Sequence, residues 1–113
     1  MKVALTTSGE TLEAPLDPRF GRAPRFLVYD TDTTAFEIVD NRAGLEAAQG
    51  AGIQAAERLA RLGVRGLVTG HCGPKALRVL DQAGIEVYNT DASTVAEALT
   101  AYREGRLCAA EPV

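Results

Sequence analysis

Two arginines, a glycine and two prolines are concentrated at positions 16–24 (Leu-Asp-Pro-Arg-Phe-Gly-Arg-Ala-Pro), directly before an apolar run. Proline fixes the backbone and glycine exposes it, while the guanidinium groups of Arg19 and Arg22 suit bidentate contacts with anions. A segment of this kind is a poor way to join two strands and a good way to hold an anion.

A second glycine-rich segment offers complementary chemistry. Gly73, Pro74 and Lys75 begin a predicted helix, and the free amides and macrodipole of a helix N-terminus favour negative charge. Positions 50–52 (Gly-Ala-Gly) repeat this arrangement before another predicted helix. Glycine also marks ordinary turns, and arginine is commonly solvated, so no single segment is specific. The prediction of an anion site depends on several such segments lying at one predicted crevice. The sequence has neither GxxxxGK[ST] nor GxGxxG, so the usual nucleotide-binding fingerprints are missing.

His71 and Cys72 are adjacent, just before that helix. A catalytic role for Cys72 ranks below a structural one, because neighbours in a turn usually point in different directions and no third orienting group is evident. As ligands, a thiolate and an imidazole suit soft metals. Two ligands do not complete a tetrahedral zinc site, but they can contact a preformed cluster that carries its own sulfides. We expect Cys108 to be structural or exposed.

A two-metal nuclease is not expected. Its chemistry needs carboxylates on central strands to hold divalent ions ~4 Å apart. The apolar segments at positions 2–7 and 64–69 contain none, and Asp17 and Asp91 form no cluster.

Composition limits the partners and the compartment. The 113 residues are 46% apolar and carry a net charge of -3, and the sequence pI near 5.1 argues against nucleic acid as the main partner. No apolar run approaches the ~18 residues of a membrane span, and the N-terminal segment, residues 1–7, is too short for the apolar core of a signal peptide. Two cysteines without a CxxC pair favour a cytoplasmic protein with reduced thiols.

Hydrophobic periodicity predicts the element order β-β-β-α-β-α-β-α within one domain, residues 1–107, followed by an irregular tail, residues 108–113. The predicted strands are 2–7, 25–29, 35–39, 64–69 and 85–88. A flexible run over 44–52 precedes a helix from about 53 to 62, and the other helices begin near 74 and 94. The predicted buried stripes of the first two helices contain Ile53, Ala56, Leu59 and Ala60, and Ala76, Leu77, Leu80 and Ala83.

Strands that alternate with helices after residue 50 require right-handed parallel crossovers, with helices on both faces of the sheet. We therefore expect an α/β fold with a mixed five-stranded sheet of ribonuclease-H-like layout. Ligands in such sheets bind beyond the carboxyl ends of the strands. Residues 8–23 and 70–74 should face each other across one crevice, with residues 89–91 on its rim.

Several segments match one known family in order and spacing. They are the motif Phe-Gly-Arg-Ala-Pro at 20–24, Asn41, and positions 50–52, 63–64, 70–76, 84–88 and 94–99. Over residues 1 to about 107 the chain resembles the dinitrogenase iron-molybdenum cofactor biosynthesis family, which includes the nitrogenase accessory proteins NifX and NafY and the C-terminal part of NifB. The resemblance implies a ribonuclease-H-like fold that binds or carries metal–sulfide clusters. The chain is similar to small free-standing members, relatives of which hold molybdenum–sulfide clusters without covalent attachment.

One departure from the family matters. Several nitrogenase accessory proteins have histidine, a candidate cluster ligand, directly before Phe-Gly, where this chain has Arg19. If the chain resembles this family but lacks the histidine, an anionic cluster is expected to be held by electrostatic contacts. His71 and Cys72 are then candidate replacement ligands.

These arguments predict a non-enzymatic carrier of an anionic metal–sulfide cluster of Fe–Mo, Mo–Cu or Fe–S type, or of its precursor, with cluster donor and acceptor proteins as partners. The alternative is a metal-free regulatory module that binds a small oxyanion or a protein. The expected binding residues are Arg19, Phe20, Gly21, Arg22, Gly70, His71, Gly73 and Lys75, with Cys72 contacting the metal.

Overall fold

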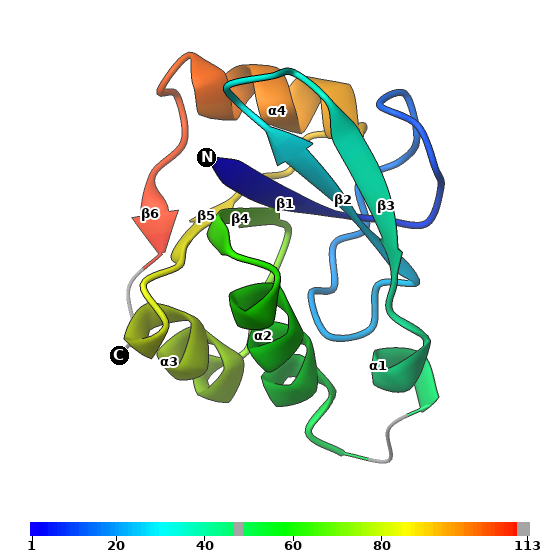
Figure 1. Cartoon of the computed structure of the whole chain (residues 1–113), viewed down its shortest axis with the longest axis vertical. Coiled ribbons are helices and arrows are strands. Elements are labelled where there is room, and N and C mark those ends of the chain that lie inside the picture. The colour runs from blue at the N-terminus through cyan, green and yellow to red at the C-terminus, as the bar shows by residue number, and fades with distance from the viewer. Residues whose placement is uncertain (47–48, 111–113) are drawn as a thin grey trace.

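A computed structural model describes residues 1–46 and 49–110 of the chain. Six strands form one mixed sheet in the order β3-β2-β1-β4-β5-β6 (Figure 1). The central strand β1 runs parallel to β4 and antiparallel to β2, and β5 runs parallel to β4. The strands are β1 (Lys2–Thr7), β2 (Arg25–Asp30), β3 (Phe36–Asp40), β4 (Val64–Thr69), β5 (Glu86–Asn89) and β6 (Ala109–Ala110).

The sheet has six strands, so the prediction of five was wrong, as was that of a wholly irregular tail. In β6, Ala109 pairs with Tyr88 and Ala110 with Val87, antiparallel to β5. Two alanines carry no alternation of apolar and polar residues, so only the neighbouring strand makes this segment a strand. Residues 111–113 of the predicted tail lie outside the described residues.

Helices cover both faces of the sheet, as the alternating pattern predicts. α2 (Ala51–Arg61) and α3 (Pro74–Gln82) pack on one face, and α4 (Val95–Arg103) packs on the other (Figure 1). Because neighbouring strand residues point to opposite faces, Ala4 joins the core under α2 and α3, whereas its neighbours in β1 join the core under α4. The two apolar layers fix the register of the sheet and the position of its carboxyl edge.

Helix boundaries and stripes differ from the prediction at a few positions. α2 begins at Ala51, and a short helix, α1 (Arg42–Glu46), occupies part of the run predicted to be flexible. Ile53 is only half-buried, and Ala60 and Ala83 are exposed. α2 instead rests on the core through Ala51, Ala55, Ala56 and Leu59. The face that carries Ile53 is therefore free to line a cavity.

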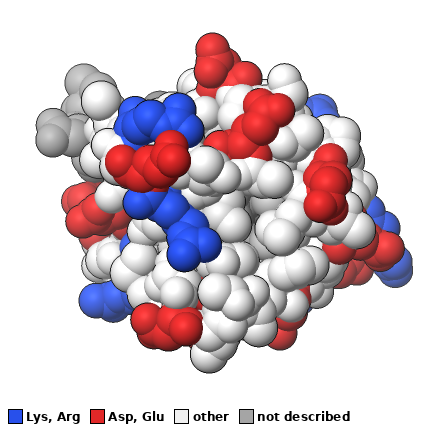
Figure 2. Space-filling model, turned by 90° about the horizontal axis from the view of Figure 1, so that it is seen from above, with Lys and Arg blue, Asp and Glu red and all other residues white. Residues whose placement is uncertain are grey.

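Charged side chains of both signs are mixed on the face that α4 covers (Figure 2). On this face acidic and basic groups surround an uncharged centre, and they form no continuous basic area. Among the residues described, no helix is long and apolar enough to cross a membrane.

Candidate functional site

The loop after β1 and the turn after β4 lie directly against each other. The amide of Phe20 donates to the carbonyl of His71 at 3.1 Å, and Arg19 and His71 form a parallel bridge. A Cβ on Gly70 would lie 2.7 Å from the Cα of Pro18, so only glycine permits this approach. The two segments do come together as predicted, but they contact each other directly instead of facing each other across a crevice, and Gly70 serves that contact.

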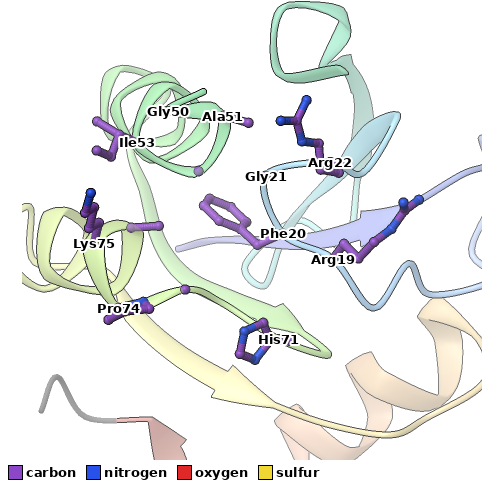
Figure 3. Close-up of a pocket in the computed structure, with 13 residues that line it drawn as sticks. Arg19, Phe20, Gly21, Arg22, Gly50, Ala51, Ile53, His71, Pro74 and Lys75 are labelled. Carbon is purple, nitrogen blue, oxygen red and sulfur yellow. The ribbon is translucent and has the colours of Figure 1, made fainter. Parts of the chain in front are cut away.

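Beside this contact is a cavity of about 450 Å³ (Figure 3). Three segments form its wall: the loop 19–22, the start of α2 and the start of α3. Of the predicted site residues, Gly70 and Cys72 do not line it. Ile53 and Ala76, predicted as core residues, do. The lining residues are Arg19, Phe20, Gly21, Arg22, Gly50, Ala51, Gly52, Ile53, His71, Gly73, Pro74, Lys75 and Ala76.

An aromatic side chain and close backbone contacts hold the cavity in shape. The ring of Phe20 is almost fully buried and contacts Phe26, with ring centroids 5.8 Å apart. In Figure 3 this ring lies between the loop and the starts of α2 and α3. A Cβ on Gly21 would lie 2.6 Å from the amide nitrogen of Gly52, so the loop touches the backbone of α2. The cavity therefore has a closely packed wall on this side.

Two helix N-termini open onto the cavity without internal caps. The N-cap residues of α2 and α3 are Gly50 and Gly73, which have no side chain to accept an amide hydrogen bond, and neither first turn contains an acidic residue. In α4, by contrast, the hydroxyl of Thr94 accepts from the amide of Glu97 at 3.1 Å. Uncapped N-termini carry partial positive charge, so the two helices together favour an anion.

Gly73 differs from the other glycines of the chain. Each of the other ten, all of them described by the structure, either has a positive φ or would bring a Cβ within 3.4 Å of another atom. Gly73 has φ -64° and ψ 159°, which any residue adopts, and a Cβ there would meet no atom within 4 Å. Neither the backbone nor packing requires glycine at this position. The missing side chain leaves space in the cavity at the N-terminus of α3.

Both arginines of the loop line the cavity but are engaged elsewhere. The Nε of Arg19 lies 3.5 Å from the carboxylate of Asp17. The guanidinium of Arg22 donates to the carbonyls of Gly44 and Leu45 at 3.2 and 3.4 Å. Figure 3 shows both guanidinium groups directed away from Pro74 and Lys75. None of the thirteen lining residues is acidic, so the cavity wall itself remains positive in character.

Asn41 holds the loop in place, a role that the sequence reasoning missed. Its buried side-chain amide donates to the carbonyls of Ala23 and Gly21 at 2.8 and 3.2 Å, and its backbone carbonyl accepts from Gly44 in α1. These bonds join the loop to α1, whose five residues are too few for a recognisable periodic pattern. The only sequence signal was an asparagine directly after a strand.

Cys72 lies between two lining residues without lining the cavity itself. It is half-buried against the core under α2 and α3, and burial raises the pKa of its thiol from 9.0 to about 11. A thiol that stays protonated at neutral pH is a weak nucleophile, which argues against a catalytic role. Within residues 1–46 and 49–110, no group of three or more His, Cys, Asp or Glu side chains is placed to hold a metal ion. Cys108 is exposed.

The rim predicted at residues 89–91 was wrong. The side-chain amide of Asn89 donates to the carbonyl of Gly70 at 3.3 Å, so it contacts the turn from outside the cavity. Thr90 and Asp91 line a separate depression beside α4. The cavity is walled by the loop 19–22, the start of α2 and the turn into α3, so the end of β5 does not reach it.

The fold and the cavity define a small α/β protein with a candidate binding cavity at the carboxyl edge of its parallel strands. The chain belongs to the family described as dinitrogenase iron-molybdenum cofactor, which matches residues 1–105. This confirms the resemblance seen in the motifs.

Individual relatives agree with this assignment. The chain is 31% identical over 110 residues to the uncharacterised protein MJ0580 of Methanocaldococcus jannaschii, covering 95% of this chain and 89% of the relative. It is also similar to the apo form of the orange protein from Desulfovibrio gigas, with 43% identity, a TM-score of 0.93 and coverage of 96% and 92% of the two chains. A NifB-type protein of Thermotoga, TM1290, has 36% identity, a TM-score of 0.82 and coverage of 94% and 90%.

Proposed function

We propose that this protein is a non-enzymatic carrier of an anionic metal–sulfide cluster or its precursor, which it receives from and passes to other proteins. The observation that carries the proposal is the open space at Gly73, in a cavity that the uncapped N-termini of α2 and α3 both line. Membership of the dinitrogenase iron-molybdenum cofactor family supports a metal–sulfide cargo, of Fe–Mo, Mo–Cu or Fe–S type.

The chemistry of the wall suits such a cargo. Thiometallate anions are polarisable and weakly hydrated, so they gain both from amide donors and from contact with apolar groups. The amides at the starts of α2 and α3 supply donors, while Phe20, Ile53 and Pro74 supply apolar surface. Arg19, Arg22 and Lys75 add positive charge at the edges. Binding of this kind needs no bond from the protein to the metal.

Soft ligands remain part of the proposal. His71 is exposed and lines the cavity, so its imidazole is the ligand that the cavity offers directly. Cys72 does not line the cavity, and its contact with a metal requires a local rearrangement of the turn. Replacing Cys72 by Ser should therefore alter the colour or stability of a bound cluster, while the amount of cluster bound changes less.

Anaerobic reconstitution tests the carrier role. The protein is mixed with tetrathiomolybdate alone, with tetrathiomolybdate and Cu(I), and with Fe(II) and sulfide, and is then separated by gel filtration. We expect at least one mixture to yield a coloured complex with a fixed ratio of metal to protein by elemental analysis. If every mixture leaves the protein colourless and free of metal, the carrier role is wrong.

A metal-free oxyanion-binding regulatory module is the second candidate. The high pKa of the Cys72 thiol and the lack of a three-ligand group in the described residues favour it. Molybdate and tetrathiomolybdate discriminate between the two candidate functions. Both are tetrahedral dianions, and they differ mainly in having oxygen or sulfur around the molybdenum. The carrier should bind tetrathiomolybdate more tightly, whereas an oxyanion module should bind molybdate at least as tightly.

A further inference from the structure

We propose that Asp17 sets the affinity of the cavity for its anionic cargo by competing with that cargo for the guanidinium of Arg19. The proposal rests on the proposed carrier function, and it assigns an affinity-determining role to a carboxylate that does not line the cavity.

Asp17 is held firmly at the end of the central strands. Its side chain is only 7% exposed, its amide donates to the carbonyl of Thr6 at 2.8 Å, and its own carbonyl accepts from the Thr6 hydroxyl at 2.6 Å. That hydroxyl also hydrogen-bonds the hydroxyl of Thr69 in β4 at 2.9 Å, and both threonines are fully buried. The carboxylate therefore occupies a fixed position beside the cavity.

The guanidinium of Arg19 is, by contrast, exposed and weakly held. The Arg19 side chain is 65% exposed, and within the described residues its guanidinium makes one contact, the 3.5 Å approach of Nε to Asp17. An ion pair with such an exposed and distant partner is weak. Because Arg19 also lines the cavity, an anion bound there offers its guanidinium a second partner. The same cation is thus shared between a fixed carboxylate and a variable cargo.

The charge of Asp17 is not needed for the local fold. Its Oδ1 accepts from the backbone amide of Arg19 at 2.8 Å, a turn that the carbonyl oxygen of asparagine would make equally well. A negative charge beside an anion site lowers affinity, because the cargo must draw the guanidinium of Arg19 away from the Asp17 carboxylate. For a carrier this loss is useful, since a cavity of amides and cations alone would release its cargo slowly.

The experiment measures the dissociation constant of tetrathiomolybdate, by absorbance under anaerobic conditions, for wild type, Asp17→Asn, Arg19→Ala and the double variant. We expect Asp17→Asn to bind about two- to fivefold more tightly than wild type, the range for releasing one exposed ion pair. In the Arg19→Ala background the same substitution should have no effect. Thermal unfolding of all four proteins checks that each one folds.

Three results would overturn the proposal while leaving the carrier function intact. They are unchanged binding by Asp17→Asn, weaker binding by Asp17→Asn, and equal tightening in the presence and absence of Arg19, which would indicate a general charge effect. A second measurement uses the wild-type protein alone. The NMR resonance of the Arg19 Nε–Hε group should shift on saturation with tetrathiomolybdate, and an unchanged resonance in a saturated protein also contradicts the proposal. Failure of the wild type to bind any metal–sulfide probe would instead refute the carrier function itself.

Discussion

Replacing Gly73 by aspartate should stabilise the protein and weaken anion binding by more than about tenfold at the same time. The backbone at Gly73 is extended, as N-cap residues usually are, and an added Cβ would meet no atom within 4 Å. The new carboxylate can then accept hydrogen bonds from the first amides of α3, as Thr94 accepts from Glu97 in α4. It would occupy the position that we assign to the cargo.

The two effects have different sizes. An aspartate N-cap improves on glycine by a few tenths of a kcal/mol, its interaction with the helix dipole adds ~0.3–1 kcal/mol, and loss of glycine freedom in the unfolded chain adds a similar amount. Together these raise the free energy of unfolding by about 1 kcal/mol, or the Tm by about 4 °C. Repulsion between a carboxylate and a dianion at about 5 Å costs ~1.7 kcal/mol even at the dielectric constant of water, a loss of at least about fifteenfold in affinity.

Gly73→Ala is the matched control, because it adds the same Cβ without the charge. Its stability should stay within about 0.5 kcal/mol of wild type, since the weaker alanine N-cap is offset by the stiffer unfolded chain. Urea unfolding and titration with tetrathiomolybdate measure both quantities for the three proteins. If Gly73→Asp binds this probe as tightly as Gly73→Ala, the anion does not lie at the N-terminus of α3. If Gly73→Asp is less stable than wild type, Gly73 is not an open N-cap.

Three further predictions follow from single interactions. Asn41→Ala should lower the free energy of unfolding by about 2–3 kcal/mol in urea melts, because two carbonyls lose a buried donor. Asn89→Ala, which removes an exposed donor, should lower it by under about 0.5 kcal/mol. Equal losses in the two variants would contradict the role of Asn41 in holding the loop. Thr94→Ala should cost about 1 kcal/mol of stability without changing the affinity for tetrathiomolybdate, and a changed affinity would show that α4 contributes to the site. In a Cys108→Ser background, the alkylation rate of Cys72 should rise with pH, with a midpoint near pH 11. Because burial raises the pKa of the folded thiol above 9.0, the contribution of this thiol to stability is complete below pH 9. That contribution is lost as the pH rises towards about 11. A midpoint at or below pH 9 would mean that the thiol is not desolvated.

The predicted architecture depended on local patterns, and these were sufficient for most elements. The apolar run of β4, proline at the start of α3 and the capping box of α4 each identify an element from a few neighbouring residues. The closeness of the two site loops followed from strand order alone, because the carboxyl ends of neighbouring parallel strands share one edge. Segments that lack a local pattern were missed. β6 exists only through pairing with β5, and α1 is tied to the loop through Asn41.

The sequence by itself determined the α/β class, the family and most of the residues that line the cavity, because glycines, prolines and apolar periodicity act over short distances along the chain. Only the tertiary structure decided how those residues are used. It paired Arg19 with Asp17 and Arg22 with the carbonyls of α1, buried the thiol of Cys72, and left space beside Gly73. Ion pairs, desolvation and empty volume depend on distances of a few ångströms between segments that are separate in the sequence, and no local pattern encodes those distances.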